Sequence, residues 1–162
     1  MVWFTEANTE PDELLQLRPE LEQRYRAFLH ALWQEGQVPR RVLELCQIRI
    51  AAIHDCPPSW WPATPPPGAG QGAVDQATQT ALRSGLNDGN RALFSDAEAA
   101  ALSVAEQIPH AHHAIVDGQI AELRSTYGNA GAVALITAMA FFDVNARLRL
   151  ALGVDVPSAQ QE

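Results

Sequence analysis

Clusters of basic side chains are missing from this sequence. It has 11 lysines and arginines against 19 aspartates and glutamates, which gives a formal net charge of −8. Because affinity for nucleic acids comes largely from clustered basic residues on phosphates, this composition disfavours a nucleic-acid partner. The sequence also lacks a glycine-rich phosphate loop, a nucleophile elbow and a dinucleotide-binding fingerprint. We therefore expect no nucleic-acid partner and no cofactor.

Long hydrophobic runs are also scarce. The N-terminal segment has no positively charged start and no long apolar core, so it does not read as a secretory signal. The longest apolar run, residues 130–142, is shorter than the ~20 residues that span a bilayer, and charged residues follow it at once. We therefore expect no membrane partner and a cytoplasmic location.

Cysteine occurs only twice, as Cys46 and Cys56. If both lie on one helix, the rise of 1.5 Å per residue puts them roughly 15 Å apart, beyond the ~7 Å Cα separation that a disulfide can bridge. We therefore expect two free thiols, which suits a reducing compartment.

Apolar residues recur at helical spacing, and no convincing strand pattern occurs. The sequence predicts helices over 19–35, 39–55, 73–84, 95–108, 117–127 and 130–152. Ser95 and Glu98 form a capping box, while Gly85 and Gly128 are typical helix ends. We predict an all-α fold with one helical domain, residues 19–157, after an N-terminal extension, residues 1–18.

The predicted helix 39–55 is the most apolar segment around its whole circumference, which is typical of a buried helix. At 100° per residue, Glu44, Gln47, Ala51 and Asp55 fall on one narrow stripe. A carboxylate in such a helix needs a partner or a raised pKa, because burying an isolated charge is costly. Arg49 lies off the stripe and is expected to pair elsewhere.

Prolines and glycines crowd the loop 57–72 that follows this helix, and they exclude a long helix there. Trp60 and Trp61 lie within it. Three interpretations remain open for this pair: a lid over a pocket, an anchor for a neighbouring subunit, or packing of the loop onto its own domain.

The first candidate for chemistry is Cys56. A thiol becomes nucleophilic when a helix N-terminus or a nearby cation lowers its pKa, and His54 is the candidate cation closest in sequence. Pro57 and Pro58 offer no N–H group to a thiolate, which weakens any anion site there. A purely structural cysteine is the alternative.

The second candidate is the cluster of His110, His112 and His113. Its spacing fits no pair of helical ligands four residues apart, and no cysteine or carboxylate ligand stands close by in sequence. We expect a solvated loop and no metal site.

Three segments carry a resemblance to a known family: LELCQIRIAAIHDC at 43–56, FSDAEAAALSVAEQI at 94–108 and NARLRLALGV at 145–154. Together they resemble the carboxymuconolactone decarboxylase family, which includes the AhpD-like alkylhydroperoxidases, over most of residues 19–157. The resemblance implies an AhpD-like helical fold and a homo-oligomer, whether dimer, trimer or hexamer.

In the alkylhydroperoxidase branch, a helix glutamate precedes a C-x-x-C-x-x-x-H motif and relays protons with it. Glu44 matches the glutamate and Cys56 the first cysteine, whereas Ser59 stands at the second cysteine and Ala63 at the histidine. The thiol expected to attack peroxide is thus absent, and Ser59 cannot form the redox disulfide with Cys56.

The resemblance allows three functions. The first is a single-cysteine peroxidase, in which Cys56 attacks a hydroperoxide, Glu44 handles a proton through water or Ser59, and a small thiol or thioredoxin-like reductant regenerates the enzyme. The second is an acid–base enzyme acting on a small organic acid or lactone, with Glu44 and His54 in a pocket walled by Trp60 and Trp61. The third is a catalytically silent relative that binds a ligand or partner.

Overall fold

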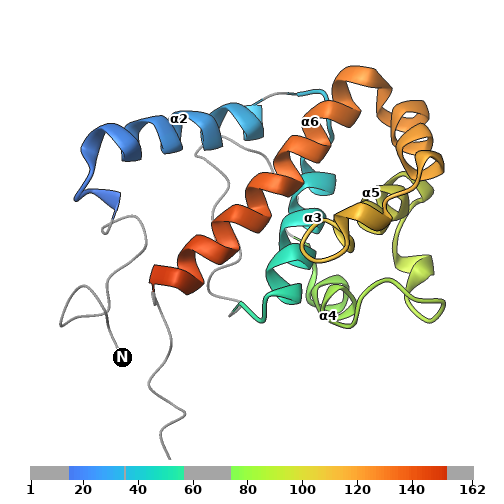
Figure 1. Ribbon diagram of the computed structural model, residues 1–162. Helices are drawn as coiled ribbons and strands as arrows, with labels where there is room; N and C mark the ends of the chain where they lie inside the picture. Colours follow the sequence, from blue (N-terminus) through green and yellow to red (C-terminus); the bar gives the residue numbers. More distant parts are fainter. Residues whose placement is uncertain (1–14, 35, 57–73, 153–162) are drawn as a thin grey trace, which may run out of the picture.

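The computed structural model describes residues 15–34, 36–56 and 74–152. Within them the chain forms helices and turns and no strand, so the predicted all-α class is confirmed. The helices are α2 (Pro19–Gln34), α3 (Arg40–Ile53), α4 (Gln76–Ser84), α5 (Asp96–Ala105) and α6 (Asp117–Leu152), with short 3₁₀ turns at Arg91–Leu93 and His112–Ala114 (Figure 1). The N-terminal extension and the loop 57–72 lie almost wholly outside the described residues.

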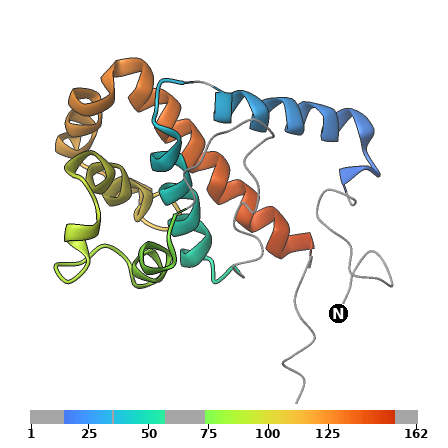
Figure 2. The same cartoon turned by 180° about the vertical axis from the view of Figure 1, so that it is seen from behind.

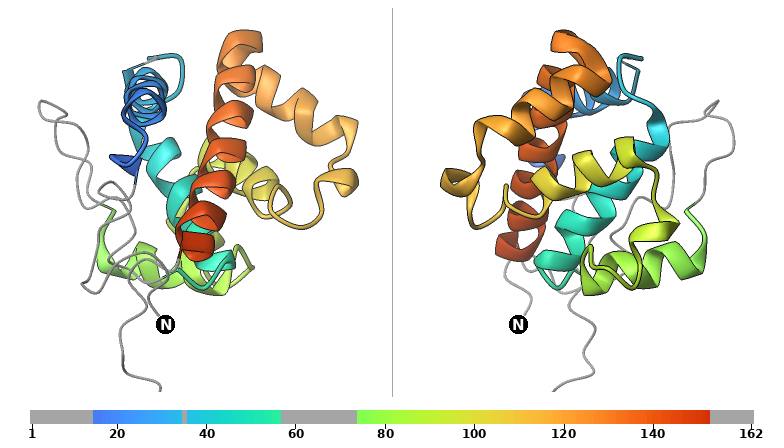
Figure 3. Two further views of the ribbon diagram at one scale, coloured as in Figure 1. Left: turned by 60° about the vertical axis from the view of Figure 1, so that its left-hand side comes forward. Right: turned by 90° about the vertical axis from the view of Figure 1, so that its right-hand side faces the viewer.

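Helix α3 lies at the centre, with α4, α5 and α6 packed around it (Figure 3). Leu45, Cys46 and Ile50 are almost completely buried, as the apolar circumference of this segment predicts. Two clusters of buried side chains meet along α3: one joins it to α5 and α6, and the other joins it mainly to α4 and α5. The core is therefore organised by this helix.

Local signals explain where the helices start. The Ser95 hydroxyl accepts a hydrogen bond from the Glu98 backbone N–H, and the Glu98 carboxylate accepts one from the Ser95 N–H, which is the predicted capping box. Helix α4 begins three residues later than predicted, because Asp75 caps it by accepting from the backbone N–H of Thr78 at 2.9 Å.

Helix α6 is two helices joined at Gly128, whose φ of 72° and ψ of 174° are non-helical. The predicted break between 117–127 and 130–152 is therefore confirmed. By length and composition alone α6 passes as a possible membrane span, although the core helices of soluble proteins pass the same test. Leu135, Met139 and Phe142 of this helix are buried against the rest of the protein.

Helix α2 lies beside the second half of α6 (Figure 2) and packs against it through aromatic side chains. Tyr25 and Phe28 both pack on Phe141, with ring centroids 5.4 and 4.8 Å away. The Tyr25 hydroxyl donates to Asn145 Oδ1 at 2.8 Å. Helix α2 thereby fixes one of the polar side chains of the site described next.

Candidate functional site

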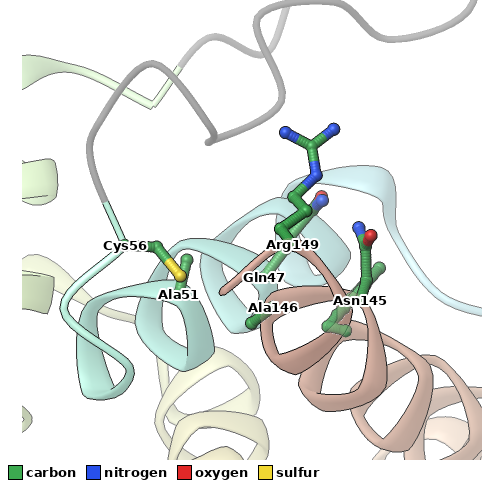
Figure 4. A pocket seen from close by; sticks show the side chains of 7 residues that line it. Gln47, Ala51, Cys56, Asn145, Ala146 and Arg149 are labelled. Carbon is green, nitrogen blue, oxygen red and sulfur yellow. The ribbon is translucent and has the colours of Figure 1, made fainter. Parts of the chain in front are cut away.

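Cys56 follows the C-terminal end of α3, where the chain turns back on the helix. The backbone N–H of Cys56 donates to the carbonyl oxygen of Ala51 at 3.0 Å, and Asp55 takes a φ of 53° to make the turn. Aspartate is one of the few non-glycine residues that occur often in this left-handed region. The reversal leaves Cys56 only 5% exposed, with its sulfur between α3 and α6 (Figure 4).

A small cavity lies at this sulfur. It is lined by Gln47, Ala51 and Cys56 from α3 and its C-terminal turn, and by Phe142, Asn145, Ala146 and Arg149 from α6. The volume within which the centre of a water molecule can move is about 20 Å³. Since one water needs ~10–15 Å³ on this measure, the cavity has the size of one or two waters.

The pKa of the Cys56 thiol is raised to about 11. Burial is the main cause, the Arg149 guanidinium lowers the pKa, and the Asp55 carboxylate raises it. The position at a helix C-terminus also disfavours a thiolate, because the helix dipole is negative there. The thiol is therefore almost fully protonated at neutral pH.

Glu44 is 8% exposed, as its position in a buried helix predicts. Its partner is Arg40, whose Nε donates to Glu44 Oε1 at 2.9 Å. The second oxygen, Oε2, has no hydrogen-bond partner in the part of the chain that the structure describes. A buried carboxylate oxygen of this kind calls for an ordered water or a ligand.

The predicted stripe on α3 connects Glu44 to the cavity. Gln47 and Ala51 of that stripe line the cavity. Glu44 lies one turn closer to the N-terminus of α3 and does not line the cavity. From Glu44 to the level of Ala51 the helix rises about 10 Å. Gln47 therefore stands between the carboxylate and the sulfur, and its buried Oε1 also has no hydrogen-bond partner among the described residues.

His54 is engaged elsewhere. Its Nε2 lies 2.6 Å from Asp143 Oδ1 of α6, and Asp143 also accepts from Arg147 Nε at 3.0 Å. His54 does not line the cavity, and the cation that lowers the pKa of Cys56 is Arg149. The prediction assigned that part to His54 because it is close in sequence.

Asn145 and Arg149 are the site residues that the sequence reasoning missed. Both lie in the segment 145–154 that carries part of the family resemblance, and that resemblance is the sequence feature that could have drawn attention to them. They belong to a helix about 90 residues further along the chain, however, and only the packing of α6 against α3 brings them to Cys56.

The other candidates are placed as follows. Ser59, Trp60 and Trp61 lie outside the described residues. Cys46 and Cys56 are both free thiols, as predicted, and burial raises the pKa of Cys46 strongly. His110, His112 and His113 are exposed, and no group of three His, Cys, Asp or Glu side chains within the described residues is placed to hold a metal ion. Arg49 pairs with Glu106 through two contacts of 2.8 and 2.6 Å.

A scan against protein-family models finds no match, and neither the search of curated proteins nor that of solved structures finds one.

Proposed function

We propose that this chain is an AhpD-like, peroxidase-related protein whose remaining thiol, Cys56, reduces small hydroperoxides slowly and without a second cysteine. The observation that carries the proposal is the cavity at the Cys56 sulfur. It combines a thiol with a guanidinium and two side-chain amides, those of Arg149, Gln47 and Asn145. In Figure 4 the Arg149 guanidinium points away from the sulfur, so it must turn inward before these donors can hold a peroxide oxygen beside the sulfur and stabilise the negative charge that develops there.

The reaction starts from the thiolate of Cys56. The sulfur attacks one peroxide oxygen, the O–O bond breaks, and the other oxygen leaves as hydroxide or alkoxide and takes up a proton to give water or an alcohol. The sulfur, now oxidised by two electrons, is a sulfenic acid. One external thiol condenses with it to a mixed disulfide and releases water, and a second thiol restores Cys56. A small thiol or a thioredoxin-like protein supplies those electrons.

Two features limit the reaction. A cavity of about 20 Å³ admits a molecule of the size of hydrogen peroxide and excludes bulky organic hydroperoxides. A thiol pKa of about 11 keeps the reactive thiolate scarce at neutral pH. The proposed protein is therefore a slow peroxidase, and free thiols in both cysteines suit a cytoplasmic location.

The test follows hydrogen peroxide consumption by the full-length protein with dithiothreitol as reductant, together with trapping of the sulfenic acid by dimedone. Cys56→Ser should abolish both signals, and Cys46→Ser, which removes the other thiol, should retain them. Unchanged peroxide consumption in Cys56→Ser would remove the proposal. With cumene hydroperoxide in place of hydrogen peroxide we expect a much slower reaction.

A catalytically silent relative is the second candidate, and the burial of the Cys56 sulfur favours it. The acid–base enzyme has less support, because the two groups assigned to it are held apart from the cavity: Glu44 by Arg40, and His54 by Asp143. Turnover of a small lactone that is lost in Glu44→Gln and kept in Cys56→Ser would favour the acid–base enzyme. Absence of both activities in the wild-type protein would favour the silent relative.

A further inference from the structure

The outward face of the second half of α6 is apolar where a surface helix is normally polar. Seven of its exposed positions follow one another at alternating steps of three and four residues and form what we call the outer stripe, which leaves out the exposed Asn129 and Leu150: Ala130, Val133, Thr137, Ala140, Val144, Arg147 and Ala151. Val133 is 67% exposed and Val144 is 56% exposed. In Figure 1, this part of α6 crosses in front of α3, and no described helix covers its near side.

The spacing of the outer stripe is that of a helix that pairs with another helix. Alternating steps of three and four residues give a mean period of 3.5, which keeps one seam facing a partner helix along its whole length. Charge is also absent from the first part of the stripe, since no residue from 129 to 142 is charged. A chain with a formal net charge of −8 repels its own copy over most of its surface, and this seam is where two copies can approach.

We propose that the outer stripe is the contact between two copies of this chain, with their α6 helices antiparallel and centred between Thr137 and Ala140. The stripe is self-complementary about that point, as a two-fold interface requires. Thr137 then faces Ala140 of the second copy, and Val133 faces Val144. The small side chains at the centre let the two helices come close together.

The position of Arg147 selects this centre. With the centre between Thr137 and Ala140, each Arg147 lies opposite Ala130 at the end of the contact, where its ion pair with Asp143 stays in contact with water. Moving the centre along the stripe by half a heptad, to residue 142, would place Arg147 opposite Thr137 inside the contact and bury the charge. The first register is therefore favoured.

The area is sufficient for a dimer of modest affinity. A seam of about 18 residues is roughly 27 Å long. With its flanks it buries on the order of 500 Å² of each chain and roughly 1,000 Å² in total, the lower limit for a specific interface. We therefore expect a dimer that dissociates on dilution. The inference does not depend on the proposed peroxide chemistry.

The first test measures the mass of the full-length protein by sedimentation velocity over a wide range of concentration. We expect the wild-type protein to shift from monomer to dimer and Val144→Glu to remain monomeric. Leu93→Glu is the matched control, because Leu93 is an exposed apolar residue (47%) away from the stripe, and this variant should dimerise as the wild type does. Circular dichroism checks that each variant is folded.

A second test fixes the orientation. Thr137→Cys mixed with Ala140→Cys should form an intermolecular disulfide faster than either variant alone. Faster cross-linking of Ala140→Cys with itself would overturn the antiparallel register. The dimer itself is overturned if the wild-type protein is monomeric throughout or if Val144→Glu associates unchanged. Binding of the monomer to phosphatidylcholine vesicles, lost in Val144→Glu, would also overturn it by showing that lipid covers the stripe.

Discussion

The rate at which Cys56 reacts with an alkylating agent should keep rising with pH well above the pH at which the rate for an ordinary cysteine levels off. With a pKa of about 11, roughly one Cys56 side chain in 1,000 is ionised at pH 8, whereas an unperturbed thiol with a pKa of about 8.5 is about one-quarter ionised. The alkylation rate should therefore rise about tenfold per pH unit up to about pH 10.

The assay is iodoacetamide labelling of the intact protein, with the Cys56 and Cys46 peptides separated by mass spectrometry. Circular dichroism at each pH shows that the protein stays folded. Cys46 serves as an internal reference for a thiol that no solvent reaches, and its labelling should remain negligible. A rate for Cys56 that levels off near pH 9 would refute the reasoning, because it would mean that the thiol reacts from an open form with an ordinary pKa.

Two substitutions at the charges around Cys56 should act in opposite directions. Arg149→Gln removes the positive charge that lowers the thiol pKa and should slow labelling at pH 9, whereas Asp55→Asn removes a negative charge and should speed it. Each effect should be roughly two- to tenfold, as expected for charges at the edge of a protein. Asparagine tolerates the left-handed backbone of position 55. Asp88→Asn, at an exposed turn, is the control and should have no effect.

Three predictions concern stability, measured by urea unfolding. Arg49→Ala should cost about 2–4 kcal/mol, because Arg49 is 12% exposed and its loss leaves the Glu106 carboxylate without its charged partner; a cost below about 0.5 kcal/mol would contradict this. Gly85→Ala should cost about 1–2 kcal/mol, because φ is 79° there and an added Cβ would lie 2.8 Å from Glu106 Oε1. Gly118→Ala is the control and should be tolerated, because open space surrounds that position. Ser95→Ala should cost about 1 kcal/mol through loss of the cap.

The capping box should also make stability depend on pH. Burial raises the pKa of Glu98, but hydrogen bonds from the Ser95 backbone and from Arg41 outweigh it, and the pKa is lowered overall. A carboxylate whose pKa is lowered by folding stabilises the protein above its unfolded pKa, and this contribution is lost as the pH falls below about 4. In Glu98→Gln the loss of stability on acidification should be smaller than in the wild-type protein, and an unchanged loss would contradict this assignment.

Much of the local structure follows from the sequence. The apolar circumference of 39–55 predicted the buried helix α3 and the burial of Glu44, and the spacing of the two cysteines predicted free thiols. Gly128 and the pair Ser95 and Glu98 marked helix boundaries correctly. These features depend on backbone conformation and periodicity within a few residues, which is why a single sequence suffices to predict them.

The site itself was decided by tertiary structure. Arg149 affects Cys56 only because α6 packs across the C-terminal end of α3, and Asp143 draws His54 away from the sulfur through the same contact. The raised pKa of Cys56 has the same origin, since it arises mainly from burial between two helices. Burial and charge at a point in space depend on segments distant along the chain, and no local pattern around residue 56 contains that information.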